Sequence, residues 1–377
     1  MKKNLVLAPG PTQVPPEVLA ASAKPTIHHR TPQFEAIFAD TAERLQRVFQ
    51  TQSPVITFAS SGTGSMESSV VNLLSPGDTA ITIEGGKFGE RWGQLCEAYG
   101  VKRVPITLEY GDVVDPAQVE EALKANPGTK AVYATLCETS TGVLSPIPAL
   151  GKIVSKTDAV LVVDAISGLA ADELRADEWG VDVVIGGSQK ALMLPPGLAF
   201  CSISEKAQAL MASSKCPKYY FSWEKALKAL ADKSTAFTPA VNLTYALQAS
   251  LDMILAEGME SVWARHARLA SALQAAIKAI GLAMFSKAPS NTVTAVKVPD
   301  GVDGGKIPKI MRDTHGVTIA GGQGSMKGKI FRFAALGWCN EFDVTTALSA
   351  LELTLTELGF QVAPGKAVGA AIAAFEG

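Results

Sequence analysis

The 377-residue sequence lacks several features that mark particular classes of protein. Its five cysteines are scattered and include no Cys-x-x-Cys pair, which favours free thiols in a reducing compartment. It has only four histidines, without ligand-like spacing, so a zinc site is not expected. A Gly-x-Gly-x-x-Gly motif after a first strand is also missing, which argues against a nicotinamide-dinucleotide fold. The cysteines are Cys96, Cys137, Cys201, Cys216 and Cys339.

Neither sign of charge dominates the chain. Lys and Arg number 34, Asp and Glu 36, and the basic residues do not cluster, so a nucleic-acid partner is not expected. No uninterrupted apolar run approaches the roughly 18 residues of a membrane span. The N-terminal stretch MKKNLVLAPGPTQVPP is broken by prolines and does not resemble a signal peptide. We therefore expect a cytoplasmic protein without a membrane partner.

Short apolar runs alternate with amphipathic stretches from about residue 53 onward. The runs are continuous rather than alternating, which is typical of strands buried on both faces by helices. Alternation of strand and helix predicts an α/β fold with a mostly parallel, open sheet. In the stretch DPAQVEEALKANPG, Asp115 is expected to cap a helix that has Pro116 in its first turn. The expected strands include residues 54–58, 79–84, 103–108, 130–136, 159–165, 181–187 and 198–204.

The pattern changes after residue 240. Residues 243–281 are helical in period and are interrupted near Gly258. Three strand-like stretches and a final helical stretch follow. We therefore expect an N-terminal segment (1–16), a large domain (17–259) and a smaller α+β domain (260–377).

Two charged side chains stand at the ends of successive apolar strands. Asp164 ends the run VLVVD, where a carboxylate is costly without a positive partner. Lys190 follows the run VDVVI, between a Gly-Gly and a Pro-Pro-Gly turn. In an apolar site its pKa would fall, which makes it a better amine nucleophile. The alternatives are a turn-capping aspartate and a surface lysine.

Two further features complete the pattern. The stretch ASSGTGSMESS (59–69) opens a helix, so the backbone N–H groups at Ser61, Gly62 and Thr63 could bind a phosphate. Arg332 lies between two phenylalanines in a strand-like run and suits bidentate binding of a carboxylate. A capped Ser/Gly turn and a structural ion pair are the alternatives. Taken together, an anion cup, a carboxylate and a lysine are what a phosphorylated pyridine aldehyde requires.

The sequence resembles the fold-type I, class V aminotransferases, which use pyridoxal 5'-phosphate, and in particular their alanine–glyoxylate / serine–pyruvate branch. The resemblance covers nearly the whole chain, and GSQKALMLPPG is its most specific part. The family implies a large domain with a seven-stranded, mostly parallel sheet. Other matching stretches are APGPTQVPPEVL, SSGTGSMESSVVNLLSPGD, ETSTGVLSPI, VLVVDAISGLA, FTPAVNLTYAL and FRFAALG.

The resemblance implies a role for each matching residue. Lys190 would carry the cofactor as a Schiff base, and Asp164 would keep the pyridine nitrogen protonated. Arg332 would bind the substrate carboxylate. Relatives often have a tryptophan at Phe88, a histidine at Thr63 and a tyrosine at Thr235. The other implied cofactor contacts are Ser61, Gly62, Thr63 and Gln189 at the phosphate, Phe88 stacked on the ring, Ile166 beneath it, Thr139 at the phenolic oxygen, and Thr235 and Thr238 at the phosphate of the other subunit.

The family therefore implies a homodimer with shared sites that transfers an amino group from a small amino acid to a 2-oxo acid by ping-pong kinetics. His28, His29 and Arg30 could line the entrance or only position the N-terminal segment. Some cyanobacterial relatives carry the name of a soluble-hydrogenase small subunit. Two other functions stay open: a lyase of the cysteine desulfurase type, for which Cys339 is the candidate thiol, and a non-catalytic subunit that keeps the fold.

Overall fold

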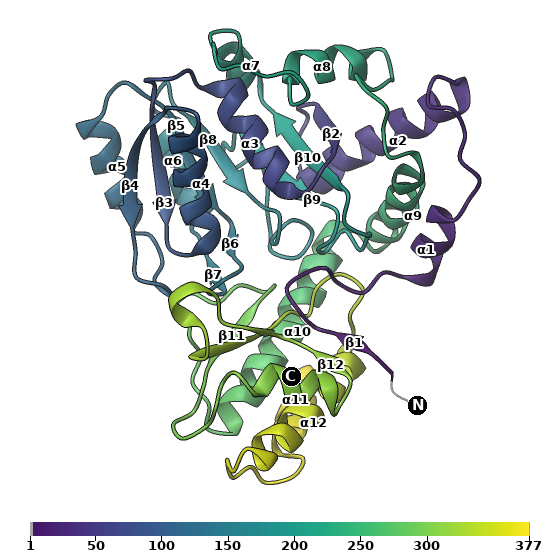
Figure 1. The fold of residues 1–377 in the computed structure, drawn as a ribbon, viewed down its shortest axis with the longest axis vertical. Helices are drawn as coiled ribbons and strands as arrows, with labels where there is room; N and C mark the ends of the chain where they lie inside the picture. Colours follow the sequence, from purple (N-terminus) through teal and green to yellow (C-terminus); the bar gives the residue numbers. More distant parts are fainter. Residues whose placement is uncertain (1–2, 377) are drawn as a thin grey trace.

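The computed structural model describes residues 3–376, and a seven-stranded sheet forms the centre of the larger part of the molecule (Figure 1). The strand order is β2-β10-β9-β8-β5-β3-β4. Strands β9, β8, β5, β3 and β4 run parallel, whereas β10 is antiparallel to both of its neighbours. The predicted mostly parallel α/β sheet is confirmed. The strands are β2 (Val55–Ala59), β10 (Leu198–Ile203), β9 (Val183–Gly187), β8 (Val160–Asp164), β5 (Thr129–Thr135), β3 (Thr79–Glu84) and β4 (Lys102–Thr107).

Helices cover both faces of this sheet, as the continuous apolar runs predicted. In β8, Leu161 and Val163 belong to one hydrophobic cluster, and Val160 and Val162 belong to another on the opposite face. The first cluster includes side chains of α1 (Pro16–Ser22), α2 (Pro32–Phe49), α5 (Pro116–Ala125), α6 (Ile147–Val154) and α9 (Val241–Glu257), and the second those of α3 (Gly62–Leu73), α4 (Lys87–Ala98), α7 (Glu205–Met211) and α8 (Trp223–Ala231).

Local sequence signals set the helix boundaries. Asp115 and Gln118 form a capping box at the start of α5, and Pro116 occupies its first turn. The break expected near Gly258 separates α9 from α10 (Met259–Ala279). Gly258 has a φ of 84°, which side-chain-bearing residues rarely adopt, so the long helical stretch becomes two helices.

The smaller part follows α10 and includes the start of the chain. Strand β1 (Leu5–Val6) pairs in parallel with β12 (Val317–Thr318), and Leu7 is buried in the hydrophobic cluster of this part. Figure 1 shows β1 beside the C-terminal elements. Three further strands form one sheet of the smaller part: β11 (Thr294–Lys297), β14 (Ile330–Phe333) and β13 (Ala320–Gly321). Its other elements are α11 (Ile307–Asp313), the 3-10 turn η1 (Gly324–Met326), α12 (Glu341–Glu357) and α13 (Lys366–Glu376). In the larger part, β6 (Cys137–Glu138) and β7 (Val143–Leu144) form a separate hairpin.

Helix α10 belongs to both parts. Met259, Val262 and Trp263 pack in the cluster of the large sheet, whereas Leu269 and the later apolar residues of α10 pack in the cluster of the smaller part. The division of the chain into domains at residues 259 and 260 stays a prediction.

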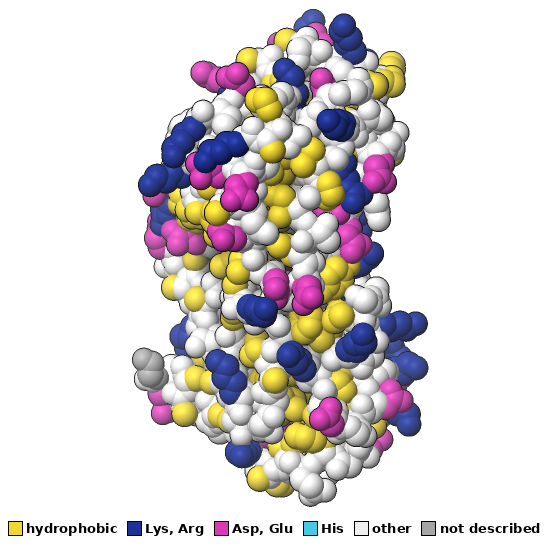
Figure 2. Space-filling view, turned by 90° about the vertical axis from the view of Figure 1, so that its left-hand side faces the viewer, with side chains coloured by type: hydrophobic (Ala, Val, Ile, Leu, Met, Phe, Trp, Pro, Cys, Tyr) yellow, Lys and Arg dark blue, Asp and Glu magenta, His cyan; other side chains and the backbone are white. Residues whose placement is uncertain are grey.

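Charges of both signs are mixed on the surface. On the face in Figure 2, basic and acidic side chains lie close to one another, with apolar side chains between them. Within residues 3–376, no helix is both long enough and apolar enough to cross a membrane.

Candidate active site

Asp164 and Lys190 stand at the same edge of the large sheet. Asp164 is the last residue of β8, and Lys190 follows the end of the parallel neighbour β9 by three residues. Their side chains are 3% and 7% exposed. The carboxyl ends of parallel strands are the usual place for ligands in open α/β sheets. The surface-lysine alternative is therefore wrong for Lys190.

Lys190 is a buried amine without a carboxylate ion pair in the described part of the chain. Its Nζ donates to the backbone carbonyl of Pro9, and Thr12 Oγ1 donates to the carbonyl of Lys190 at 2.9 Å. Burial lowers the pKa of Lys190 to about 8, and the positive charges of Arg332 and Arg91 act in the same direction. A substantial fraction of Lys190 is therefore neutral near physiological pH, which nucleophilic and proton-transfer chemistry requires.

Asp164 is the matching buried acid. One carboxylate oxygen, Oδ1, accepts a hydrogen bond from the backbone N–H of Ile166 at 2.8 Å, so Asp164 also caps the turn that follows its strand. Burial raises its pKa to about 7, while the charges of Arg91 and Lys190 oppose that rise. A cationic group beside Asp164 would hold it in the ionised form.

The start of α3 is open for an anion. Ser61 is the N-cap residue, yet its side chain makes no capping hydrogen bond. A Cβ atom at Gly62 would collide with the side chain of Ile166, so a larger residue at this position would force Ile166 to move. Thr63 Oγ1 accepts a hydrogen bond from Arg91 Nη1 at 2.9 Å, which adds a cation near the helix terminus.

Gln189, next to Lys190, carries an unsatisfied polar atom. Its Oε1 is buried and has no hydrogen-bond partner among residues 3–376. Such atoms are rare in folded proteins and indicate a group that a ligand can satisfy.

Arg332 lies in the smaller part of the molecule but reaches the larger one. It sits in β14 between β11 and β13 and is 4% exposed. Its Nε and Nη2 donate to the carbonyl of Gly321 at 3.0 and 2.7 Å, and its Nη1 donates to the carbonyl of Thr139 at 2.6 Å. No carboxylate forms an ion pair with it in the described part of the chain, so the structural ion-pair alternative is wrong.

Burial lowers the pKa of Arg332 to about 10, so the guanidinium remains charged at neutral pH. A buried cation of this kind is suited to bind a carboxylate.

The residues expected around the cofactor ring lie on three segments. Phe88 is in the first turn of α4, and the guanidinium of Arg91 lies 4.8 Å from its ring centre. Thr139 follows β6, and its Oγ1 is 2.5 Å from Ser167 Oγ. Ile166 packs against Gly62. The turn after β6 thus links the large sheet to Arg332.

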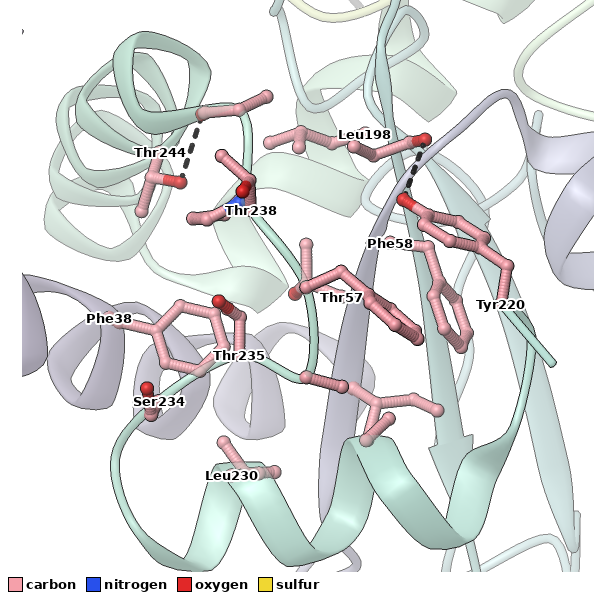
Figure 3. A pocket seen from close by; sticks show the side chains of 17 residues that line it. Phe38, Thr57, Phe58, Leu198, Tyr220, Leu230, Ser234, Thr235, Thr238 and Thr244 are labelled. Carbon is pink, nitrogen blue, oxygen red and sulfur yellow. Dashed lines mark hydrogen bonds between the residues drawn. The ribbon is translucent and has the colours of Figure 1, made fainter. Parts of the chain in front are cut away.

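Thr235 and Thr238 lie elsewhere within the chain. They line a pocket between α2, α8 and the strands β2 and β10, together with Phe38, Phe58 and Tyr220 (Figure 3). Lys190 and Asp164 are not among its lining residues. A contact of these threonines with the cofactor of a second subunit stays a prediction.

Of the three residues left open near the N-terminus, Arg30 contacts a residue of the Thr235 pocket. Arg30 Nη1 donates to Ser234 Oγ, and Ser234 lines that pocket. His28 and His29 stack loosely on each other, with ring centres 4.7 Å apart. The contact of Arg30 supports a positional role for this segment.

Sequence reasoning missed several residues of the site. Glu138 and Arg91 both contact predicted site residues, and Pro9 and Gly10 pack against Lys190. Glu138 lies three residues after the apolar strand β5, which is a weaker form of the signal that identified Asp164. The role of Pro9 depends on its backbone carbonyl and has no side-chain signal.

The donor set fits pyridoxal phosphate. Lys190 supplies an amine for its aldehyde, Asp164 a carboxylate for its ring nitrogen, and the open start of α3 a place for its phosphate. Gln189 lies on the same loop as Lys190 and would donate to the phosphate from its Nε2, because a phosphate oxygen is an acceptor, as is the unpaired Oε1 of Gln189.

Comparison with known proteins agrees with this chemistry. The family model described as "Aminotransferase class-V" matches residues 5–337. The chain is 36% identical to L-aspartate–glyoxylate aminotransferase of Paracoccus denitrificans and 35% identical to serine–glyoxylate aminotransferase of Methylorubrum extorquens, with 98% of this chain and 95% of each relative covered. It is also 41% identical to a protein named soluble hydrogenase, small subunit, of a Synechococcus strain, over 98% of this chain and 97% of that protein.

The fold agrees as well. The solved structure of ureidoglycine–glyoxylate aminotransferase from Bacillus subtilis superposes with a TM-score of 0.94 at 30% identity, covering 100% of this chain and 99% of the other. Family and fold thus converge on the chemistry for which the buried lysine, aspartate and arginine are suited. The chain belongs to the class-V aminotransferases, and it is a pyridoxal phosphate-dependent transaminase.

Proposed function

We propose that this transaminase transfers the amino group of a small amino acid, alanine or serine, to a 2-oxo acid such as glyoxylate or pyruvate by ping-pong kinetics. The observation that carries the proposal is Arg332, a buried cation held by backbone carbonyls and free of a carboxylate ion pair among the described residues. Every amino donor and every 2-oxo acceptor carries the α-carboxylate that such a group can bind.

The names of the relatives support glyoxylate as the acceptor. Three of the compared proteins are named for glyoxylate, whereas their donors differ: aspartate, serine and ureidoglycine. The acceptor is therefore the shared element, and the donor depends on the side chains of each protein. Serine appears among those donors and agrees with the small donor proposed here.

Pyridoxal phosphate, when bound, supplies an aldehyde and an electron-withdrawing ring that stabilises negative charge at the substrate Cα. Lys190 would hold the cofactor through its Nζ and, once released as a neutral amine, would accept the proton of the substrate Cα at that atom. Asp164 would supply the carboxylate that pairs with the ring nitrogen and favours its protonated form. Arg332 orients the substrate by its α-carboxylate. The lowered pKa of Lys190 and the intact charge of Arg332 match these two tasks.

We propose the following positions for the other residues. Ser61, Gly62, Thr63 and Gln189 hold the phosphate, Phe88 and Ile166 lie on opposite sides of the ring, and Thr139 binds the phenolic oxygen. Thr235 and Thr238 complete the phosphate site of a second copy, so that the enzyme works as a homodimer in the cytoplasm. The buried Thr235 Oγ1 has no hydrogen-bond partner within the described chain, which supports an external partner.

The two rival functions find little support in the site. A desulfurase needs a reactive thiol, but Cys339 is buried and burial raises its pKa. A scaffold has no use for three buried ionisable groups, each of which costs stability. The hydrogenase name of one relative therefore does not displace transamination.

The deciding experiment is a spectral titration of the purified protein loaded with pyridoxal phosphate. Alanine, serine, glutamate and aspartate are added one at a time, and glyoxylate or pyruvate follows. Bleaching of the visible band by alanine or serine, and its return with the 2-oxo acid, is the expected result. Bleaching only by glutamate or aspartate would overturn the small-donor proposal. A protein that stays colourless after incubation with the cofactor would overturn transamination itself.

A further inference from the structure

Glu138 is a buried carboxylate to which the proposed reaction assigns no task. It is the last residue of β6, directly before Thr139, and it is 5% exposed. Lys or Arg forms no ion pair with it in the described part of the chain. A buried carboxylate without a cationic partner needs several hydrogen bonds to be tolerated.

Those hydrogen bonds come from the start of helix α4 and from the turn after β6. Glu138 Oε2 accepts from the backbone N–H groups of Phe88 and Gly89 at 3.1 and 2.9 Å. Glu138 Oε1 accepts from the backbone N–H and the hydroxyl of Ser140 at 3.0 and 2.5 Å. The N-cap residue of α4 is Gly86, which has no side chain to accept hydrogen bonds from the first N–H groups of the helix. The carboxylate of Glu138, from strand β6, accepts them instead.

The same turn holds the substrate side of the site. The carbonyl of Thr139 accepts from Arg332 Nη1 at 2.6 Å, and Ser140 Oγ accepts from the backbone N–H of Lys87 at 3.0 Å. One short segment therefore contacts both the helix that carries Phe88 and the guanidinium of Arg332. The negative charge of Glu138 also raises the pKa of Arg332, which opposes the effect of burial.

The side chains of Glu138 and Ser140 pack closely against the backbone at Gly86. A Cβ atom at Gly86 would lie 2.5 Å from Glu138 Cγ and 2.5 Å from Ser140 Oγ. Burial raises the pKa of Glu138, while the hydrogen bonds from Ser140, Gly89 and Phe88 act in the opposite direction. The absence of a side chain at Gly86 thus makes room for this carboxylate.

We propose that Glu138 is a positioning residue that sets the stacking ring of Phe88 and the carboxylate-binding Arg332 relative to each other. Cofactor affinity and donor affinity then depend on one buried carboxylate that touches neither ligand. The inference rests on the roles proposed for Phe88 and Arg332. It adds to them a coupling between the two ligands through the turn at residues 138–140.

The test compares Glu138→Gln with Glu97→Gln, the same change at an exposed position of helix α4. Glutamine keeps one acceptor oxygen and presents an NH₂ group to N–H donors, so Glu138→Gln loses hydrogen bonds and a charge. We expect about a tenfold rise in the dissociation constant of pyridoxal phosphate. The same variant should show a weaker circular dichroism of the bound cofactor. Glu97→Gln should stay within about twofold of the wild type.

The donor side is read with 2-methylalanine, an amino acid that has no Cα hydrogen. Its spectral dissociation constant reports carboxylate binding without turnover, so it remains measurable even if the proposed donor or acceptor is wrong. We expect this constant to rise about tenfold in Glu138→Gln. Double variants with Phe88→Ala and with Arg332→Lys should show less than additive effects, because each pair acts through the same turn.

Three outcomes would overturn the proposal. The first is a lowered melting temperature with both constants unchanged, which means that Glu138 is only structural. The second is a change in one constant alone, and the third is full additivity in both double variants. If Glu138→Gln does not fold, Ser140→Ala replaces it, since it removes the hydroxyl bond to Glu138 Oε1. A smaller rise in both constants is then expected, and a rise in only one contradicts the coupling.

Discussion

Lys190 and Arg332 are two buried basic groups whose pKa values are lowered by burial to different final values. Each lies without a carboxylate ion pair among the described residues, and burial lowers the pKa of each. Lys190 reaches a pKa of about 8 and is held by the carbonyl of Pro9. Arg332 reaches only about 10 and donates to the carbonyls of Gly321 and Thr139.

The difference teaches how one kind of environment yields two functions. The same desolvation brings an amine into the range where it exchanges protons, whereas a guanidinium begins so high that it stays charged. Lys190, at the edge of the large sheet, is therefore suited to proton transfer and nucleophilic chemistry. Arg332, in the smaller part, is suited to binding a carboxylate. Substitutions at the two positions should separate these tasks.

Replacing Lys190 by alanine is expected to have the largest effect. The proposed nucleophile and proton carrier are lost together, so kcat should fall roughly 10³- to 10⁴-fold. Borohydride should also no longer fix the cofactor to the peptide that contains residue 190, which mass spectrometry would show. Arg332→Ala is the control, because it should retain that fixation. Retention of fixation in Lys190→Ala would place the cofactor on another lysine.

Replacing Arg332 by lysine should impair binding more than chemistry. A lysine keeps the charge but loses the fork that donates to two carbonyls and to a carboxylate at once. The KM for alanine or serine should rise roughly 10- to 100-fold, with a smaller change in kcat. Steady-state kinetics over a wide range of donor concentration would check this. A selective fall in kcat would assign chemistry to Arg332 and break the comparison.

The part of the site at the edge of the large sheet could be predicted from the sequence. Asp164 and Lys190 each follow a continuous apolar run, and a charged residue there signals a buried, functional position. Parallel strands bring their carboxyl ends to one edge, so the proximity of the two residues followed from the strand order. The sheet itself was predictable because its apolar runs are long and uninterrupted.

The contacts between distant segments could not be predicted in the same way. Pro9 acts through a backbone carbonyl, and Arg91 reaches Thr63 from a different helix. Such contacts depend on packing, which hydrophobic periodicity does not encode. Glu138 lies only a short way beyond an apolar run, and nothing in the sequence shows which backbone groups it would cap. For Thr235 and Thr238 only the family resemblance supplied an expectation.

Substitution of Gly10 tests whether the N-terminal segment fixes the position of the Lys190 side chain. Its φ is 101°, and a Cβ atom there would lie 2.6 Å from Lys190 Cδ. Gly10→Ala should lower kcat about tenfold by displacing the amine. Gly77→Ala is the matched control, since Gly77 has a φ of 89° and nothing within 4 Å of its added Cβ.

Both variants should lose about 1–2 kcal/mol of stability through backbone strain. Steady-state kinetics and urea unfolding would separate the two effects. Equal losses of activity in the two alanine variants would show that strain alone, and not contact with Lys190, limits the enzyme.

The pH dependence of stability gives the most direct comparison of the two cations and leaves catalysis out. In cofactor-free protein, Lys190→Met and Arg332→Met are measured against the wild type from pH 7.5 to 9.5. Well below pH 8 Lys190 is protonated in both the folded and the unfolded state, so the cost of burying its charge is fully present there. Above pH 8 the folded state loses this proton while the unfolded lysine, near its ordinary pKa of 10.5, keeps it.

The wild type should therefore gain stability relative to Lys190→Met as the pH rises, by roughly 2 kcal/mol across this window. The difference from Arg332→Met should stay nearly constant, because the folded pKa of Arg332 is about 10 and its unfolded pKa is higher still. Asp164, with a pKa of about 7, has largely titrated before the window begins. Urea unfolding at each pH measures both differences. If the stability difference from the wild type changed with pH equally in both variants, the two buried groups would not differ in protonation over this range. The division between chemistry at Lys190 and binding at Arg332 would then need another cause.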